Sequence, residues 1–305
     1  MIKKYIALVY TPFQLSMVNC LIVDKLIPHD TLILDFSNQS RKSDHHYTKS
    51  NSFIKFTYEI LKLRFFRTDY NSRIILIPHG FGVLSNIVLA RNNYDEIRFY
   101  HEGILSFYTP QLENYKISTN KKLFSLLLFH RFSKAHVFDF SQGTIFYTPF
   151  PKLTIKKSNQ LINFQLPDYK FSDPTPGRAL ILDSPNLNIN RKIINAINKL
   201  LDENGIELAD IKLHPSQKKR IKIHPFSDLL TCQTKFLNTN TGLEDLCQDL
   251  SPEIIISSMS SALFNLLPSN HKMKIFILIE AEKFKGNYLR FCDYLKAKGA
   301  IIKIV

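Results

Sequence analysis

Short, uninterrupted apolar segments alternate with longer amphipathic segments along almost the whole chain, and this alternation restricts the fold class more than any other feature. Strand-length segments without internal polar alternation are typical of parallel sheets that are buried on both faces. Their alternation with helix-length segments is typical of βαβ units. The first half has apolar segments at 5–10, 31–36, 73–77, 96–100 and 135–138, with amphipathic segments at 12–26, 52–65, 82–91 and 121–132.

A break in this pattern separates the chain into two parts. Residues 149–177 contain five prolines and no long apolar periodicity, which is typical of a linker. The alternation then resumes, with strands expected at 178–182, 210–213, 235–238, 253–257, 274–279 and 301–305, and helices at 189–203, 243–250, about 260–267 and 281–298. We therefore predict an α/β fold of two Rossmann-like domains, 1–148 and 178–305, whose parallel sheets face a central cleft.

Composition excludes several classes of protein. The 24 Phe and 13 Tyr residues are too many for a disordered chain. The four cysteines share no short spacing, so neither a disulfide framework nor a zinc site is indicated, and we expect free thiols in a reducing cytoplasm. The net charge of +14 is compatible with nucleic acid, anionic lipid or a phosphorylated substrate as partner, and charge alone does not choose among them.

The N-terminus resembles the start of a secretory signal, because Lys3-Lys4 precede an apolar stretch. That stretch stops at Thr11-Pro12, and no segment has the roughly 20 apolar residues of a membrane-spanning helix. We therefore interpret it as a first buried strand that turns into a helix, and we expect a cytoplasmic protein.

Three predicted strands end in residues that could take part in catalysis or ligand binding. Ligands of open α/β sheets bind at the carboxyl ends of the strands. Glu102, before a glycine, could accept a proton from an attacking hydroxyl. His214, held by Pro215, could stabilise a leaving phosphate. Serines 257, 258, 260 and 261 precede a helix, where hydroxyls and free N–H groups bind phosphate. Individually, each could be an ordinary turn residue or helix cap.

The order of these motifs resembles that of bacterial sialyltransferases: an acidic-Gly motif in the first half, then His-Pro, then a Ser-Ser pair. The opening Tyr10-Thr11-Pro12-Phe13-Gln14 is similar to the start of the lipooligosaccharide sialyltransferases of glycosyltransferase family 52, relatives of the bacterial polysialyltransferases. The resemblance implies a two-domain GT-B fold, CMP-sialic acid as donor, no cofactor, and inversion at the anomeric carbon without a metal.

The resemblance also implies roles for individual residues. His214 would stabilise the leaving CMP phosphate, and Ser260 and Ser261 would hold it, with Ser257 and Ser258 as the competing pair. Glu244 occupies the place of a Glu that binds the nucleotide ribose, although it could equally be a first-turn acid favoured by the helix dipole.

One position departs from the family pattern. The family's base is usually the first acidic residue of an acidic-acidic-Gly motif, and here that position is His101. Either Glu102 is the base, or His101 is, or the donor chemistry differs. We favour Glu102, because a carboxylate near a basic cleft stays ionised at neutral pH.

Other signals bear on cofactors and partners. The chain has no Gly-rich phosphate loop and no Asp-x-Asp, so a metal clamp on a nucleotide sugar has no obvious ligands. The basic run 218–222 is either a solvated loop or a contact with anionic membrane. Nucleic acid is not expected, since no recognised binding motif accompanies the charge.

The leading hypothesis is thus a sialyltransferase that acts on a bacterial surface glycan, lipooligosaccharide or capsule, as a peripheral protein at the inner face of the membrane. One alternative is a GT-B enzyme that uses another nucleotide sugar. The other is a basic, non-catalytic binding protein.

Overall fold

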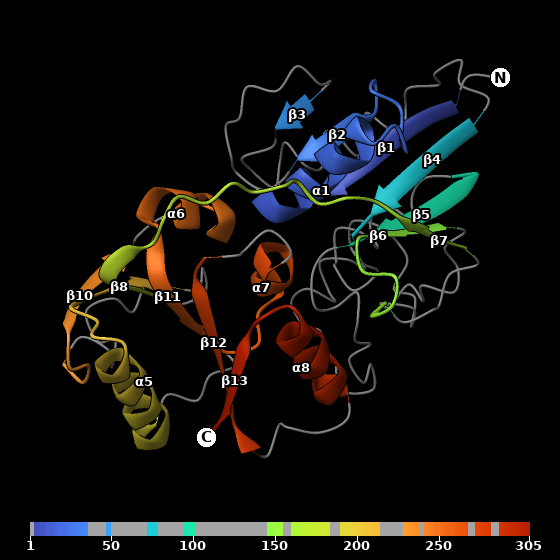
Figure 1. The fold of residues 1–305 in the computed structure, drawn as a ribbon. Helices are drawn as coiled ribbons and strands as arrows, with labels where there is room; N and C mark the ends of the chain where they lie inside the picture. The colour runs from blue at the N-terminus through green and yellow to red at the C-terminus, as the bar shows by residue number, and fades with distance from the viewer. Residues whose placement is uncertain are drawn as a thin grey trace, which may run out of the picture. The chain divides into compact units, whose positions relative to one another are not determined.

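Two compact units make up the chain, Met1–Pro167 (unit 1) and Asp168–Val305 (unit 2). The structure is a computed structural model. It describes residues 3–35, 47–49, 72–78, 94–101, 145–154, 160–183, 190–213, 228–237, 241–267, 272–281 and 287–305. Each unit is built around its own parallel sheet (Figure 1).

The sheet of unit 1 has seven described strands in the order β3-β2-β1-β4-β5-β6-β7. All of their pairings are parallel. Since β1 lies between β2 and β4, the strand order reverses there, and the carboxyl ends of β1 and β4 flank the switch point where such sheets bind ligands. The strands are β1 (Lys3–Val9), β2 (Leu32–Asp35), β3 (Tyr47–Lys49), β4 (Ser72–Ile77), β5 (Glu96–Tyr100), β6 (Ile145–Thr148) and β7 (Gln160–Asn163).

The sheet of unit 2 repeats this plan with six described strands, in the order β10-β9-β8-β11-β12-β13. Its pairings are also parallel, and its switch point lies between β8 and β11. The strands are β8 (Thr175–Leu182), β9 (Leu208–Lys212), β10 (Gln233–Leu237), β11 (Pro252–Ser257), β12 (Lys274–Ile279) and β13 (Ile301–Ile304). The prediction of two Rossmann-like domains with parallel sheets is confirmed.

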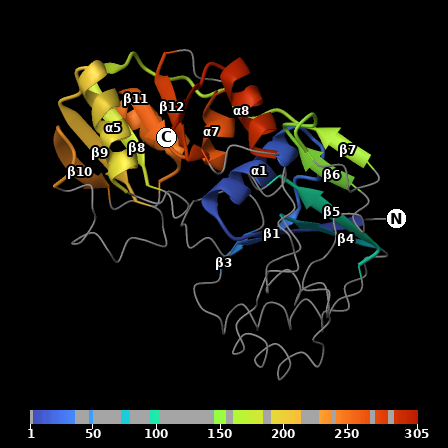
Figure 2. The same ribbon diagram turned by 90° about the horizontal axis from the view of Figure 1, so that it is seen from below.

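Helices cover the sheets in the way that an alternating strand–helix sequence requires. Figure 2 shows α1 (Pro12–Val23) lying on one face of the sheet of unit 1, where Met17 and Leu21 enter the core beside Ala7 and Tyr100. In unit 2, α5 (Arg191–Glu203) packs Ile193, Ile197 and Leu201 against β8, β9 and β11. The other described helices of unit 2 are α6 (Leu243–Leu250), α7 (Ser261–Leu266) and α8 (Asn287–Ala297).

The Tyr10–Gln14 motif has a structural role at the start of α1. Thr11 is the N-cap, and its Oγ1 accepts a hydrogen bond from the N–H of Gln14 (3.2 Å). The Gln14 side chain, which is 4% exposed, reaches back to accept from the N–H of Tyr10 (2.7 Å). Pro12 occupies the first helical turn, where its missing N–H is not needed. The motif thus ends β1 and begins α1 through a variant of the capping box.

We expect Thr11→Ala to accelerate amide hydrogen exchange at Gln14 by about 2–30-fold. Loss of an N-cap costs about 0.5–2 kcal/mol, and the Gln14 amide would lose its acceptor. Exchange measured by mass spectrometry on peptides of α1 tests this. Asn190→Ala, which removes the N-cap of α5 in unit 2, is the matched control and should leave α1 unaffected. Unchanged exchange at Gln14 in Thr11→Ala would contradict the capping role.

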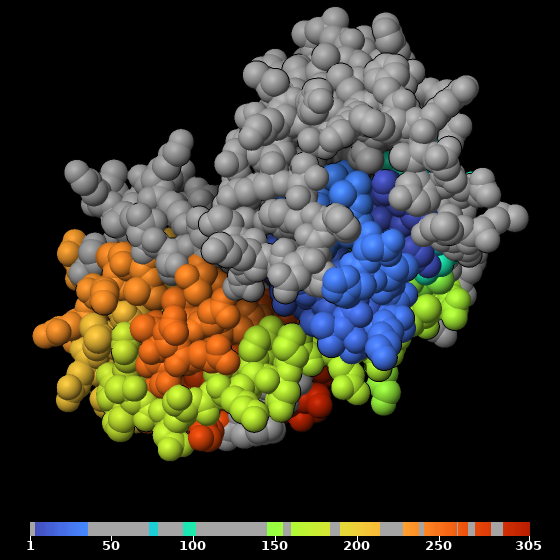
Figure 3. Space-filling view, turned by 90° about the horizontal axis from the view of Figure 1, so that it is seen from above, coloured from blue at the N-terminus to red at the C-terminus, as the bar shows by residue number. Residues whose placement is uncertain are grey.

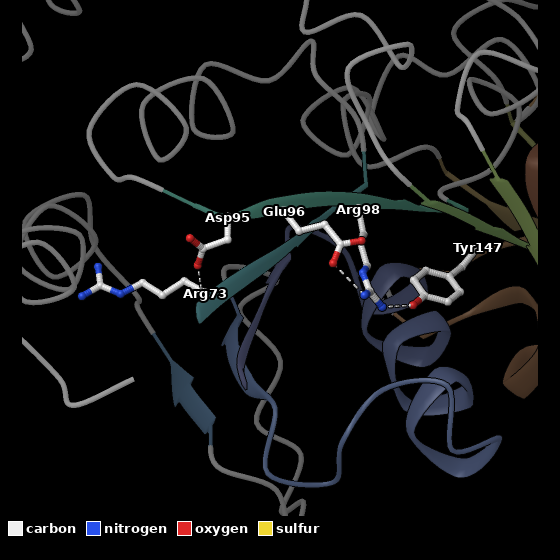
Figure 4. Close-up of polar contacts among 5 residues, drawn as sticks. All are labelled: Arg73, Asp95, Glu96, Arg98 and Tyr147. Atoms are coloured by element: carbon white, nitrogen blue, oxygen red, sulfur yellow. Dashed lines mark hydrogen bonds and ion pairs between the residues drawn. The ribbon is translucent and has the colours of Figure 1, made fainter. Parts of the chain in front are cut away.

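A buried ionic network lies within the sheet of unit 1 (Figure 4). The Arg98 guanidinium donates to the Tyr147 hydroxyl (2.6 Å) and to the Glu96 carboxylate (2.8 Å), and it lies 5.2 Å from the centre of the Tyr5 ring. Burial opposes the charged guanidinium, but Glu96 and Tyr147 together outweigh burial and raise the pKa of Arg98 above its ordinary value. The backbone N–H of Arg73 in β4 also donates to the carboxylate of Asp95 (2.5 Å), the residue just before β5.

The expected linker differs from the observed chain. β7 and the first three residues of β8 fall within 149–177, so the sheets extend into this range from both sides. Residues 164–174 contain neither helix nor strand, and the side chains from 165 onward are mostly exposed at the surface (Figure 3). Of the five prolines, Pro167 and Pro174 lie in this short connection, which spans the boundary between the units, whereas Pro149 and Pro151 precede β7 and Pro176 is part of β8.

The remaining element predictions divide into two groups. Of the helix expected at 281–298, the structure describes Asn287–Ala297 as helix, and residues 282–286 lie outside the described residues. The strand expected at 135–138 and the helices expected at 52–65, 82–91 and 121–132 lie outside the described residues.

Candidate active site

In unit 1, the carboxyl end of β5 leads into His101, the position at which the resemblance places a base. The ring is 0% exposed and is packed between Phe13 and Phe150, with centroid distances of 6.0 and 5.3 Å. The His101 N–H donates to the carbonyl of Tyr147 (2.9 Å), which extends the pairing of β5 with β6.

Burial lowers the pKa of His101 to about 3. The imidazole is therefore neutral at pH 7 and has little tendency to take up a proton. This enclosure by Phe13 and Phe150 favours a packing role for the ring over that of a general base. Glu102, the other candidate base, lies outside the described residues.

In unit 2, polar residues lie at the carboxyl edge of the sheet, beside the switch point between β8 and β11. Asp183 directly follows β8, and its N–H donates to the carbonyl of Lys212 (3.0 Å), the last residue of β9. The serine-rich turn 257–260 leaves β11 and leads into α7. Both features occupy the edge at which a doubly wound sheet binds nucleotides.

The serines of this turn have different environments. Ser257 is 2% exposed, and its hydroxyl donates to the carbonyl of Ser258 (2.7 Å). Ser258 is 7% exposed, and its buried hydroxyl has no hydrogen-bond partner among the described residues. Ser260 is partly exposed at the N-cap of α7, yet its side chain makes no capping hydrogen bond. Its hydroxyl is therefore better placed than those of Ser257 and Ser258 to meet a ligand, and the side chain of Ser261 is not described.

Glu244 lies in the first turn of α6, close to the same edge. Burial raises the pKa of its carboxyl, and the nearby Lys212 acts in the opposite direction. Lys212 Nζ also donates to the carbonyl of Thr241 (2.8 Å), just before Gly242, the N-cap of α6. The charged end of β9 thereby anchors the segment from which α6 and Glu244 begin.

Helix α7 contributes a residue that the sequence analysis missed. Asn265 Nδ2 donates to Glu244 Oε1 over 3.4 Å, and this contact joins α7 to α6. A single Asn within the apolar segment 262–267 is a signal that could have drawn attention to it. Lys212 was missed as well, although a charged residue at the end of a buried strand, two positions before His214, is a comparable signal.

His214 and Pro215 lie outside the described residues. They follow Leu213, which comes directly after β9 and is 1% exposed. Within the described part of the chain, no cluster of three or more His, Cys, Asp or Glu could hold a metal ion. None of the described helices is both long and apolar enough to cross a membrane.

Comparison with known proteins finds similarity in fold and none in sequence. No protein-family model matches the chain, and no curated protein matches it in sequence. Among solved structures, an α/β-galactoside α-2,3-sialyltransferase from the luminous marine bacterium Photobacterium phosphoreum is similar over 98% of both chains, with a TM-score of 0.57 and 12% identity.

Two UDP-N-acetylglucosamine 2-epimerases have the same type of fold. The enzyme from Rickettsia bellii matches 92% of this chain and 79% of its own, with a TM-score of 0.52 and 15% identity. The enzyme from Methanocaldococcus jannaschii, solved with UDP-GlcNAc and UDP, matches 100% and 89%, with a TM-score of 0.52 and 14% identity. The chain therefore has a GT-B-like fold of two Rossmann-like domains, similar to that of a bacterial sialyltransferase.

Proposed function

We propose that this protein is an inverting sialyltransferase that moves sialic acid from CMP-sialic acid to a bacterial surface glycan. The observation that supports this most directly is the serine-rich turn between β11 and α7. It lies at the switch point of a Rossmann-like unit, and its Ser260 is partly exposed and makes no capping hydrogen bond with its side chain. This is the place in the fold where the resemblance puts the donor phosphate.

The proposed reaction breaks one bond and forms one bond. The acceptor hydroxyl attacks the anomeric carbon of sialic acid while its proton passes to Glu102. The bond from the anomeric carbon to the phosphate oxygen breaks, and its electron pair leaves with CMP, which His214 and Ser260 stabilise. Glu244 binds the ribose of the donor, and no metal or cofactor takes part.

The proposal also includes the place where the protein works. The acceptor would be a glycolipid or a glycan on a lipid carrier, and the basic run 218–222 would hold the protein at the anionic inner face of the membrane. Each basic residue near such a surface contributes on the order of 1 kcal/mol.

A second candidate is a GT-B enzyme that uses another nucleotide sugar. Its support is the fold similarity to two UDP-GlcNAc 2-epimerases, one of them solved with UDP-GlcNAc and UDP. Fold does not determine chemistry, so the donor has to be identified by experiment. A panel of CMP-, UDP-, GDP- and ADP-activated sugars, assayed for nucleotide release, separates the candidates. Release from CMP-sialic acid alone supports the first candidate, release from another donor supports the second, and no release with no binding contradicts both.

Transfer should persist in excess EDTA. The resemblance implies metal-independent catalysis, and the chain contains no Asp-x-Asp that could clamp a metal on the donor phosphate. Initial rates with CMP-sialic acid, measured before and after dialysis against EDTA, test this. Complete loss of activity that magnesium or manganese restores would contradict the proposed chemistry.

A further inference from the structure

Asn265 is a buried polar residue in an otherwise apolar part of α7. Its neighbours Leu263, Phe264 and Leu266 are 0% exposed, and Asn265 itself is 1% exposed. Nδ2 donates to Glu244 (3.4 Å), whereas Oδ1 has no hydrogen-bond partner among the described residues. A buried polar atom without a partner costs about 1–3 kcal/mol. An apolar side chain of similar size would avoid this cost, so packing does not account for the amide.

The Glu244 carboxylate is confined on two sides. Oε1 receives the Asn265 amide, and Oε2 lies over Gly242, where a Cβ atom would come within 3.1 Å of it. Glycine therefore allows the carboxylate to fold over the start of its own helix, and Asn265 fixes the other oxygen. Lys212 holds the preceding carbonyl of Thr241. These contacts restrict the orientation of a side chain that would otherwise rotate at the beginning of α6.

We propose that Asn265 is a positioning residue that orients the Glu244 carboxylate to accept hydrogen bonds from the ribose hydroxyls of the donor nucleotide, and this inference rests on the proposed function. A carboxylate has about four acceptor sites on two oxygens, so it can keep the amide and still bind the two neighbouring hydroxyls of a ribose. Free rotation would reduce the selectivity of that contact, because a ligand would have to order the side chain on binding.

The experiment compares binding of CMP with binding of 2′,3′-dideoxycytidine monophosphate by isothermal titration calorimetry. The two ligands share base and phosphate and differ only in the ribose hydroxyls. Hydrogen bonds to a charged group are worth about 1.5–3 kcal/mol, so the wild-type protein should prefer CMP by about 10–100-fold. Both Glu244→Gln and Asn265→Leu should reduce this preference several-fold or more, while affinity for the dideoxy nucleotide stays near the wild-type value.

Two further variants separate positioning from stability. Asn265→Asp preserves the shape of the side chain but places a second carboxylate beside that of Glu244. At pH 8, its preference for CMP over the dideoxy nucleotide should therefore be no larger than that of Asn265→Leu. If the Asn265→Leu protein does not fold, Asn265→Asp serves as the test variant in its place. Asn204→Leu is the matched control: Asn204 caps the far end of α5, where Nδ2 donates to Leu200, and its loss should leave the CMP preference intact.

Each outcome supports or overturns the inference. If Glu244→Gln loses the preference and the Asn265 variants retain it, the positioning role is wrong while the proposed function stands. If the Asn265 variants weaken both nucleotides equally, the residue is structural only, and if Glu244→Gln keeps the preference, the ribose contact itself is wrong. If the wild-type protein binds neither nucleotide, the proposed function fails and the inference fails with it.

Discussion

Glu102→Gln should lower the turnover of sialyl transfer by about 10²–10⁴-fold, the usual contribution of a general base. The amide has the shape of the carboxylate but cannot take up the acceptor proton. His214→Ala should produce a loss of the same order by removing the group that stabilises the departing phosphate. Single-turnover kinetics with CMP-sialic acid measure both effects, and the CMP affinity of Glu102→Gln should stay near the wild-type value.

His101→Ala is the discriminating control for the base. Because the His101 ring is enclosed by Phe13 and Phe150, its truncation should reduce stability while the chemical step is retained in the folded protein. If His101→Ala abolishes transfer and Glu102→Gln does not, the imidazole is the base and our assignment is wrong. The chain contains a second His-Pro pair, His224-Pro225. If His224→Ala removes activity and His214→Ala does not, that second pair stabilises the leaving phosphate.

Arg98→Met should lower the free energy of unfolding of unit 1 by about 3–5 kcal/mol, the cost of removing one partner from a buried ionic network. Methionine fills similar volume but removes the hydrogen bond to the Tyr147 hydroxyl and the ion pair with Glu96. Hydrogen exchange of peptides from β5 and β6 under native conditions measures the effect within unit 1. A local readout is preferable, since a chain of two compact units need not unfold in one transition.

A combined variant tests whether unpaired polar groups are the cause of the expected instability of Arg98→Met. Arg98→Met with Glu96→Leu and Tyr147→Phe removes the three side chains that are joined by the described hydrogen bonds. Well-packed apolar replacements of buried ion pairs are often neutral or stabilising. Protection should therefore return most of the way to the wild-type level. If the combined variant is as unstable as Arg98→Met, the cost comes from lost packing and not from unpaired polar groups.

The central strands of both sheets could be predicted from the sequence, and the edge regions could not. β1, β4, β8, β11 and β12 each contain a continuous apolar run, because that part of each strand is buried on both faces. β3 and β7 are short, lie at the edge of the sheet of unit 1, and contain polar residues. β6 is only four residues long. Such strands form because a neighbouring strand offers hydrogen bonds, and pairing between distant segments leaves little trace in local sequence.

The candidate site shows a similar division. Motif order identified the turn after β11, since serines between an apolar run and a helix start are visible in a sequence. Burial then distinguished the serines: Ser257 is bonded internally, Ser258 is enclosed, and Ser260 is partly exposed. Phe13, which belongs to the Tyr10–Gln14 motif, packs against the His101 ring, and only the tertiary structure shows this contact.

The sequence by itself determined the α/β class, the division into two Rossmann-like units and the strand ends at which chemistry is expected, because these follow from local periodicity. Only the tertiary structure decided which polar side chains are enclosed and which ones meet. The contact between Asn265 and Glu244 joins residues 21 positions apart on different helices, and the pKa of His101 depends on rings from α1 and from the turn after β6. Both depend on desolvation and on neighbours brought together by packing, which periodicity along one segment does not encode.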